Sequence, residues 1–496
     1  MAPTRLGFAS QRRSGAALIS KIFSRKSVQA NLATLFESNA NLFGDKPALV
    51  WDKGCLSYAE LDQRASAFAR FLATHGVSPG DRIALLLPNQ WTFAAALFGI
   101  LKLGATAATL NPGLKREELE EILADLRPRG VVEKVEFDEG AWVTSKQTAA
   151  PALIVYTSGS TGRPKGAVFS HGALAFANQS WGGPVMRLSS EDVVLGVLPF
   201  SHNFGMNGAL LAPLLFGASV AILERFTPDA VFDTIRRFQA TVFPGVATIF
   251  RRLLSSPAFS AADLSSLRLA VSGAAPCPWE LCQEWRERTG IRILRGYGMT
   301  EVPRPISYFV DDPADFPDAI GRPVPGVEIR VVDDAGRSLS CGQVGELWIK
   351  SPTAMDGYLD AREETHEVMV DEWFKTGDLA CVSPEGFIRI AGRKRERILR
   401  GGYSVFPQEV EATLLSHSSV AEAAVVGIPN PDLGEEVAAF VTLKPLAKAT
   451  AEELIRHCEK RLAHYKFPRS VAILAELPKG HTGKVLKSEL MKKQVP

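Results

Sequence analysis

The chain has few cysteines, almost no net charge and no long hydrophobic run, and each shortage excludes a class of protein. Its 496 residues include six cysteines, none in the CxxC spacing of a zinc site or redox motif. Scattered cysteines fit reduced thiols in the cytosol better than a disulfide framework. The formal charge of +2, from 56 basic and 54 acidic residues, argues against a protein that coats nucleic acid or anionic lipid.

The most apolar stretches are too short or too interrupted to cross a membrane. Residues 93–110 contain Lys102, and residues 208–223 fall short of the roughly 18–20 apolar residues that a spanning helix needs. Both stretches predict buried helices or strands. No repeat with a period of 20–50 residues recurs, which excludes a solenoid or propeller.

The first 36 residues lack acidic side chains, since the first acidic residue is Glu37. The segment also contains basic residues among serines and alanines, at Arg5, Arg12, Arg13, Lys21, Arg25 and Lys26. This composition is typical of an organellar transit peptide and equally of a solvated extension. We expect residues 1–30 to be a disordered basic extension of a cytoplasmic protein, and organellar targeting stays open.

Helical and strand patterns alternate through most of the chain. Residues 119–126 have apolar side chains at helical spacing, and short apolar runs at 131–137, 193–198, 218–223 and 269–272 predict strands. This alternation predicts an α/β architecture with substantially parallel sheets. At about 150 residues per domain, the length predicts two to four domains or subdomains.

The last hundred residues have the pattern of a separate small α+β domain. Strand-like runs at 423–428 and 437–443 precede a helix, and a further strand is predicted at 470–477. Thr450 and Glu453 have the spacing of a capping box at the start of that helix. The predicted divisions are a large domain at 31–391, a polar hinge at 392–402 and a small domain at 403–496.

The strongest motif, residues 156–166, follows a predicted strand at 152–155. It contains Thr157, Ser158, Gly159, Ser160, Thr161 and Gly162, followed by Lys165. Glycines let the backbone amides of such a loop converge on an anion, and a lysine adds a charge for phosphate oxygens. No Gly-Lys-Ser/Thr closes the run, which excludes a Walker A motif. A plain Ser/Gly surface turn is the alternative, and the full eleven-residue pattern favours phosphate binding.

Two further motifs carry carboxylates. Residues 296–301, after a predicted strand at 292–294, combine Tyr297, whose ring can stack on a nucleobase, with Glu301, which can hold Mg²⁺. A core tyrosine with a surface glutamate explains this string equally well. The string 376–378 places a carboxylate on a predicted turn, where it is either solvated or accepts the hydroxyl groups of a ribose.

Two basic clusters complete the set. Residues 393–400 hold five basic side chains in eight positions, but the near-neutral total charge and the lack of aromatic residues between them argue against a nucleic-acid patch. Residues 478–484 end on a lysine after Gly-x-x-Gly. That lysine is either part of a solvated tail or a mobile charge for a phosphate.

Together these motifs resemble the adenylate-forming superfamily of acyl- and aryl-CoA synthetases, peptide-synthetase adenylation domains and firefly luciferase. The resemblance covers about residues 30–490 and extends to shorter strings at 111–112, 198–200, 272–276, 321–323 and 345–348. It implies a large N-terminal domain of αβα-layered subdomains with a β-barrel-like subdomain. A small, mobile α+β C-terminal domain follows in this family.

The resemblance implies a two-step reaction. A carboxylate attacks the α-phosphate of ATP to give acyl-AMP and pyrophosphate, and a thiol then displaces AMP to form a thioester. Mg²⁺ is the implied cofactor, with ATP and CoA as co-substrates. The first transition state concentrates negative charge at phosphorus, so cationic and amide donors are expected to dominate catalysis.

The resemblance also assigns roles to residues of this chain. Pyrophosphate is assigned to Thr157, Ser158, Gly159, Ser160, Thr161, Gly162 and Lys165, and adenine to Gly273, Ala274, Ala275 and Tyr297. The remaining nucleotide contacts are Thr300 on the α-phosphate, Glu301 on Mg²⁺, Asp378 and Arg393 on the ribose, and Lys484 bridging carboxylate and α-phosphate in the first step only. CoA is assigned to Gly401 and Gly402.

Two departures from the family pattern stand out. The pivot of the domain rotation, which withdraws Lys484 and opens a pantetheine tunnel, falls on Arg395-Glu396, where relatives commonly have Lys or Asp followed by an acid. Arginine keeps the charge of the lysine form, so we expect the rotation to be retained. The segment 111–156 is also shorter than in most relatives. We expect this difference to affect local packing and oligomer contacts, such as those of a homodimer, more than the chemistry.

The acyl pocket is assigned to His202, Asn203, Phe204, Val246, Gly298 and Met299. Phe200, Met206 and Phe243 add apolar character unless they pack in the core. Ser201 stands where amino-acid-activating relatives have aspartate, and an ammonium without a carboxylate is costly in a dry pocket. The prediction is therefore an apolar aliphatic, cyclic or aromatic acid. His202 either gates or lines the pocket, or is structural.

CoA is the predicted acceptor because no carrier domain is fused to the chain and the sequence ends soon after Lys484. One alternative is a stand-alone ligase that loads an acyl carrier protein. Another is a nucleotide-binding protein without catalysis. The presence of five residues disfavours it: Lys165, Glu301, Asp378, Arg393 and Lys484. Nucleic acid and a transmembrane segment are not expected.

Overall fold

The computed structural model describes residues 31–138, 142, 144, 150–157, 164–312, 316–401, 403–479 and 485–492. They form two compact units. The first contains the described residues up to Glu328 together with Lys350–Phe374, and the second contains Ile329–Ile349 and the residues from Lys375 onward. The predicted α/β class, with a large N-terminal and a smaller C-terminal part, is confirmed. The hinge predicted at 392–402 lies inside the second unit, and its role stays a prediction.

The first unit is built on two sheets. The larger has the strand order β14-β13-β12-β11-β10-β8-β9-β1-β2. Its strands are β1 Pro47–Trp51, β2 Gly54–Ser57, β8 Val193–Gly196, β9 Ser219–Ile222, β10 Val242–Gly245, β11 Leu269–Ser272, β12 Ile293–Tyr297, β13 Ile306–Ser307 and β14 Arg322–Pro323. The strands from β1 through β9, β8, β10 and β11 to β12 pair in parallel, as the alternating pattern predicted.

The second sheet of this unit has the order β17-β7-β6-β4-β3-β5. Its strands are β3 Arg82–Leu85, β4 Thr106–Thr109, β5 Gly130–Val132, β6 Leu153–Thr157, β7 Lys165–Phe169 and β17 Gly357–Tyr358. The four strands β5, β3, β4 and β6 are parallel, whereas β6, β7 and β17 pair antiparallel. The predicted phosphate loop therefore connects the two strands of a hairpin.

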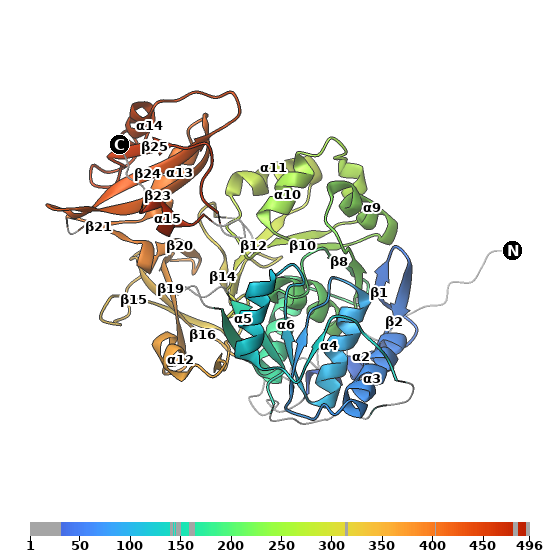
Figure 1. Ribbon diagram of the computed structural model, residues 1–496. Coiled ribbons are helices and arrows are strands. Elements are labelled where there is room, and N and C mark those ends of the chain that lie inside the picture. Colours follow the sequence, from blue (N-terminus) through green and yellow to red (C-terminus); the bar gives the residue numbers. More distant parts are fainter. Residues whose placement is uncertain are drawn as a thin grey trace. The chain divides into compact units, whose positions relative to one another are not determined.

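Helices flank these sheets: α9 contacts β8, α11 contacts β12, and α3 packs along α4 (Figure 1). Their bounds are α2 Leu32–Phe43, α3 Tyr58–Thr74, α4 Trp91–Leu103, α5 Arg116–Leu126, α6 His171–Ser180, α7 Asn203–Gly205, α8 Ala212–Leu215, α9 Pro228–Phe238, α10 Ala247–Leu254, α11 Trp279–Thr289 and α12 Arg362–Val368. Two π-helical turns lie at Trp181–Val185 and Met206–Leu211. The predicted amphipathic helix at 119–126 is confirmed as part of α5.

The apolar stretch at 93–110 forms α4 and β4 in the core, as predicted. Lys102, which interrupts it, is only 1% exposed. Its Nζ lies 2.9 Å from Asp62 Oδ1 and also pairs with Glu37, so the buried charge is compensated. No helix among the described residues is long and apolar enough to cross a membrane.

The second unit contains two further sheets. In the first, β15 Glu328–Val332, β16 Gly345–Lys350 and β19 Trp373–Val382 are adjacent, and β20 Ile388–Arg393 pairs with β19. The other has the order β22-β21-β24-β23, with β25 beside β24. Its elements are β21 Ile398–Arg400, β22 Tyr403–Val405, β23 Val420–Asn430, β24 Gly434–Leu443 and β25 Ser470–Ile473, with helices α13 Pro407–Leu415, α14 Ala451–Glu459 and α15 Lys487–Leu490. The capping box of Thr450 and Glu453 is present at α14.

Several predicted strands differ in extent from those observed, and three of them are instructive. The strand predicted at 131–137 is only β5, because it is the edge strand of its sheet and the chain bends at Glu133. The strand predicted at 470–477 ends at Ile473, and the one predicted at 292–294 continues to Tyr297. Apolar runs locate a strand but not its ends, because pairing with neighbouring strands sets the ends.

Candidate functional site

The hairpin of β6 and β7 fixes both stems of the predicted phosphate loop. Thr157 pairs with Lys165, and Tyr156 pairs with Gly166. The Tyr156 hydroxyl donates to Asp125 Oδ2 at 2.6 Å. A Cβ at Gly166 would lie 2.9 Å from Ile154 Cγ2, so a side chain has no room there. Ser158, Gly159, Ser160, Thr161 and Gly162 lie outside the described residues.

Tyr358 connects the predicted phosphate lysine with the predicted metal ligand. It lies on β17 opposite Ala167 of β7. Lys165 Nζ lies 5.3 Å from the centroid of the Tyr358 ring, and the Tyr358 hydroxyl donates to Glu301 Oε1 at 2.9 Å. Burial and the Glu301 charge raise the pKa of Tyr358, which keeps its hydroxyl protonated as a donor. The structure thus brings Lys165 and Glu301 together through a residue that no sequence motif contains.

A chain of three asparagine side chains holds the backbone at Thr300. The Asn203 amide donates to the Thr300 carbonyl oxygen at 2.9 Å. Asn207 donates to the Asn203 carbonyl at 3.0 Å, and Asn178 donates to Asn207 Oδ1 at 2.8 Å. Asn178 and Asn207 are buried. Sequence reasoning placed Asn203 in the acyl pocket and missed the other two, because only the fold brings them together.

The residues predicted to flank adenine lie at the ends of adjacent parallel strands. Gly273, Ala274 and Ala275 directly follow β11, and Ala274 has a left-handed φ of 63°. Ala274 and Ala275 are exposed. Tyr297 is the last residue of β12 and is partly buried, so the prediction that it follows the strand was wrong. Carboxyl ends of neighbouring parallel strands are a common site for ligands in α/β sheets.

Of the residues predicted for the acyl pocket, Phe204 and Gly298 lie beside Arg304. Phe204 packs on Trp181 with ring centroids 5.4 Å apart. A Cβ at Gly298 would lie 2.4 Å from the Arg304 backbone nitrogen, so only glycine fits. Met299 accompanies it in the same turn, and Val246 is partly buried at the start of α10. His202 is exposed, yet surrounding atoms desolvate it and lower its pKa.

Two aromatic residues considered for the pocket are core residues instead. Phe243 is fully buried, with ring centroids 5.0 Å from Phe250 and 6.3 Å from Trp285. Phe200 is also fully buried, 5.7 Å from Phe93. Their side chains fill the space between sheet and helices, which a sequence pattern cannot distinguish from the wall of a pocket.

The two residues predicted to bind ribose pair with each other in the second unit. Asp378 on β19 lies opposite Arg393 on β20, and Arg393 Nε is 2.7 Å from Asp378 Oδ1. Asp378 is only 3% exposed. Its backbone amide donates to Thr376 Oγ1 at 3.0 Å. The prediction that Asp378 lies on a turn was wrong, because the 376–378 string is part of a ten-residue strand.

The predicted pivot, Arg395, is exposed at the centre of a single 3-10 turn. Its neighbours are held by ion pairs: Lys394 with Glu346 at 3.0 Å, and Glu396 with Lys487 at 2.9 Å. Gly401, predicted to contact CoA, has a left-handed φ of 55°. Gly402 and Lys484 lie outside the described residues.

Glu301 fits a Mg²⁺ ion that is held mainly by phosphates. The described residues contain no cluster of three or more His, Cys, Asp or Glu side chains that could hold a metal by themselves. Glu301 Oε1 accepts the Tyr358 hydroxyl, and within the described chain its Oε2 has no protein donor. Mg²⁺ commonly takes one or two carboxylates, with phosphate and water oxygens completing its octahedron.

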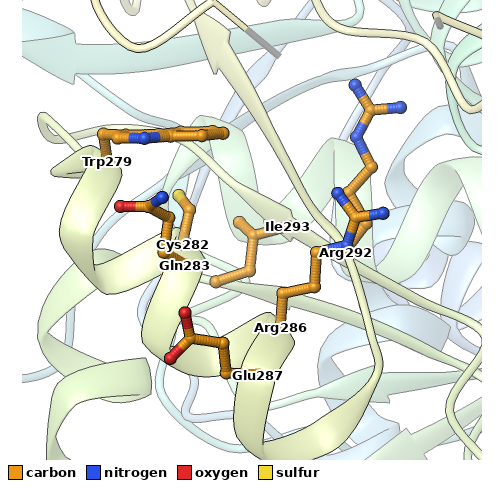
Figure 2. Close-up of a pocket in the computed structure, with 7 residues that line it drawn as sticks. All are labelled: Trp279, Cys282, Gln283, Arg286, Glu287, Arg292 and Ile293. Atoms are coloured by element: carbon orange, nitrogen blue, oxygen red, sulfur yellow. The ribbon is translucent and has the colours of Figure 1, made fainter. Parts of the chain in front are cut away.

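A small pocket of about 270 Å³ lies against α11 and β12 (Figure 2). Its lining residues are Trp279, Cys282, Gln283, Arg286, Glu287, Arg292 and Ile293. None of these is a predicted substrate ligand, and the volume is below the usual range for ligand pockets, roughly 300–1,000 Å³. The predicted substrate residues therefore define the candidate site, and this pocket does not.

Comparison with known proteins identifies similar chains. A family model described as AMP-binding enzyme matches residues 36–149 and 138–359, and its C-terminal domain model matches 409–484. A long-chain-fatty-acid–CoA ligase of Yersinia pestis is 32% identical, covering 94% of this chain and 95% of that protein. A feruloyl-CoA synthase of Amycolatopsis sp is 33% identical, covering 88% of this chain and 94% of the other.

Among solved structures, ATP-bound MatB from Rhodopseudomonas palustris superposes with a TM-score of 0.86 at 30% identity, covering 93% of this chain and 98% of that one. The resemblance inferred from the motifs is confirmed. The two ranges matched by the AMP-binding enzyme model overlap at residues 138–149. This overlap lies within the segment predicted to be shorter than in most relatives.

Proposed function

The chain belongs to the AMP-binding enzyme family of adenylate-forming acid–thiol ligases, and from that premise we propose that it is an ATP-dependent carboxylic acid–CoA ligase. It converts an acid and ATP into acyl-AMP and pyrophosphate, and then passes the acyl group to the CoA thiol. The observation that carries this proposal is the arrangement of Lys165, Tyr358 and Glu301. It sets a cation for phosphate oxygens next to a carboxylate for a metal ion, at the base of the predicted phosphate loop.

In the first step the protein stabilises negative charge on the triphosphate. Lys165 and the amides of the loop after Thr157 bind the pyrophosphate portion, and Thr300 binds the α-phosphate. Bound Mg²⁺ would neutralise phosphate oxygens, with Glu301 as its protein ligand. Tyr358 orients the Glu301 carboxylate, and Asn203 holds the Thr300 backbone in place.

The second unit supplies the ribose and lysine functions. The buried Asp378 carboxylate accepts the ribose hydroxyls, and Arg393 orients that carboxylate. Lys484 bridges the acid and the α-phosphate in the first step and is withdrawn in the second by rotation about Arg395. Gly401 and Gly402 are assigned to the entry of CoA. An acyl carrier protein is the alternative acceptor, and a cytoplasmic location and a homodimer complete the proposal.

Carboxylate-dependent ATP–pyrophosphate exchange on the full chain tests the proposal. A panel of aliphatic, cyclic and aromatic acids should yield exchange with at least one acid, and Glu301→Gln should reduce it at least a hundredfold. Glu117→Gln is the matched control, because Glu117 is exposed on α5. Adding CoA or a holo carrier protein then identifies the acceptor by its thioester. A chain that binds ATP but exchanges with no acid is a nucleotide-binding protein without catalysis.

A further inference from the structure

Arg304 lies three residues after Glu301, between β12 and β13, and its backbone has a left-handed φ of 37°. Its side chain follows the space left by two glycines. A Cβ at Gly296 would lie 2.6 Å from Arg304 Cζ, and one at Gly273 would lie 3.1 Å from Nη1. The guanidinium therefore lies at the carboxyl ends of β11 and β12, where the substrate residues are predicted.

Two aromatic rings flank the Arg304 guanidinium. Its Cζ lies 4.7 Å from the Trp181 ring centroid and 5.8 Å from that of Phe204. Phe204 and Gly298, both predicted to line the acyl pocket, contact Arg304 or leave room for it. A positive charge thus lies inside a region for which the sequence predicted only apolar character.

The structure gives this charge neutral acceptors at long distances. Nε and Nη2 donate to Ser307 Oγ at 3.3 and 3.1 Å, Nη1 to the Ser272 carbonyl at 3.4 Å, and Nη2 to the Leu294 carbonyl at 3.5 Å. In the part of the chain that the structure describes, Arg304 has no carboxylate partner. Arg268 and Arg322 of this unit, whose side chains are 36% and 40% exposed, do pair with carboxylates, those of Asp192 and Asp312.

An arginine in such surroundings calls for an anion. Burial lowers the pKa of Arg304 to about 9, so the group is still charged at neutral pH. Buried charges in proteins are ordinarily paired, and an unpaired one destabilises the fold. The planar guanidinium matches the two oxygens of a carboxylate, and its faces stack on aromatic rings. The hydrogen bonds of Arg304 go to neutral acceptors, and a carboxylate ligand would supply the missing counter-charge.

Resting on the ligase function proposed above, we propose that Arg304 determines specificity by pairing with a second carboxylate at the far end of the acid. The substrate class is then a dicarboxylic acid, of which one carboxylate is activated by ATP and the other binds Arg304. Trp181 and Phe204 contact the apolar part between the two. This replaces the wholly apolar acid expected from sequence.

Matched pairs of acids that differ only at the far end test this inference. Suitable pairs are succinate with butyrate, glutarate with pentanoate, adipate with hexanoate, and terephthalate with 4-methylbenzoate. In ATP–pyrophosphate exchange the wild-type chain should show a kcat/KM at least tenfold higher for the diacid in one or more pairs. Arg304→Met, uncharged but similar in length, should reverse that preference and gain activity with the monoacid. Arg304→Lys should keep part of the preference.

Arg252→Met is the control variant, because Arg252 also stacks on an aromatic ring, Phe226 at 4.5 Å, but is exposed on α10. It should leave the diacid-to-monoacid ratio unchanged. Calorimetric titration of the wild-type chain with both acids of the best pair adds a measurement that no variant's folding affects. The diacid should bind at least tenfold more tightly.

Three results would contradict the inference while leaving the ligase function intact. They are a preference for the monoacid in every pair, an equal loss of both activities in Arg304→Met, and equal calorimetric affinities. Absence of exchange with every acid is a different outcome. It would overturn the proposed function, and this inference with it.

Discussion

The Tyr358 hydroxyl donates a hydrogen bond of 2.9 Å to Glu301 Oε1, across 57 positions of sequence. The same ring lies 5.3 Å from Lys165 Nζ. One side chain therefore contacts two groups with opposite charges and different predicted partners, a metal ion and a phosphate. Tyr358 therefore links the predicted metal ligand to the predicted phosphate ligand, and this link can be tested by mutation.

Tyr358→Phe retains the ring beside Lys165 and removes only the bond to Glu301. Because a hydrogen bond to a charged group contributes about 1.5 kcal/mol or somewhat more, exchange at limiting Mg²⁺ should fall roughly tenfold. The loss should diminish as Mg²⁺ is raised. Tyr403→Phe, at an exposed residue of β22, should have no effect. A deficit independent of Mg²⁺ would contradict the orienting role of Tyr358.

Lys484→Ala should separate the two half-reactions. Without this charge the α-phosphate loses its bridge to the acid. Acyl-AMP formation should therefore fall by roughly a thousandfold, the upper end of the loss caused by removing one transition-state donor. Thioester formation from supplied acyl-AMP should persist. Equal loss of both half-reactions would show that domain alternation is wrongly assigned to this chain.

Asn203 distinguishes a positioning role from a pocket role. If Asn203 acts through its hydrogen bond to the Thr300 carbonyl, Asn203→Ala should lower the exchange rate by the same factor for every acid that the enzyme uses. One lost buried hydrogen bond corresponds to about a tenfold decrease. A change in the ranking of acids would instead place Asn203 in the acyl pocket. The acid panel with wild-type and variant chains measures the difference.

Cys277 should be more acidic than an ordinary thiol. Its sulfur lies 3.6 Å from that of Cys282, and a hydrogen bond from Cys282, aided by the charge of Arg295, lowers the pKa of Cys277 to about 7. The thiolate forms as pH rises, so alkylation by iodoacetamide should be half-maximal near pH 7, as followed on the Cys277 peptide by mass spectrometry. Cys282→Ala should move that midpoint upward, and an unchanged midpoint would exclude the pair as the cause.

His171 should make the fold sensitive to acid. It is 3% exposed, its Nδ1 accepts the Leu32 amide at 2.9 Å, and burial lowers its pKa to about 4. The unfolded chain, with an ordinary histidine pKa of about 6.5, binds the proton first as pH falls. Stability is therefore complete above about pH 6.5 and decreases toward pH 4, by about 2 kcal/mol between pH 7 and pH 5.

Chemical denaturation at pH 7 and pH 5 measures this loss. His171→Asn keeps an acceptor for the Leu32 amide but cannot titrate, so its stability should change less between the two pH values. His366→Asn, at an exposed position of α12, should behave like the wild type. Identical pH dependence in all three chains would assign the acid sensitivity to other groups.

Local patterns predicted local structure well. The spacing of Leu119, Ile122, Leu123 and Leu126 located α5, and Thr450 with Glu453 located the start of α14. Both depend on residues within one or two turns of each other. The motifs likewise indicated the family, since each is a continuous string whose residue types suit one chemistry.

Contacts between distant segments were not predictable. Tyr358 reaches Glu301 because β17 adds to the β6–β7 hairpin, and Arg304 meets Trp181 because a loop folds back over Gly298. Tyr358 belongs to no motif, and Arg304 lies in the range 298–306 expected to contribute to the acyl pocket but was not singled out there. Phe243 and Phe204 are similar in sequence terms, yet one fills the core and the other lies beside Arg304. Only the packing of strands and helices separates such cases.

The contacts of α2 set a limit on proteolytic trimming at the start of the chain. The Asn31 side chain accepts a hydrogen bond from the Ala33 amide at 2.9 Å and donates one to the Leu101 carbonyl. The Leu32 amide donates a hydrogen bond to His171, and Glu37 forms an ion pair with the buried Lys102. A protease that removes residues 1–30 leaves every one of these contacts intact. A cut a few residues further along the chain removes the hydrogen-bond donor of His171 and exposes α4. Any shortened form of the chain that keeps these contacts therefore begins at or before Asn31.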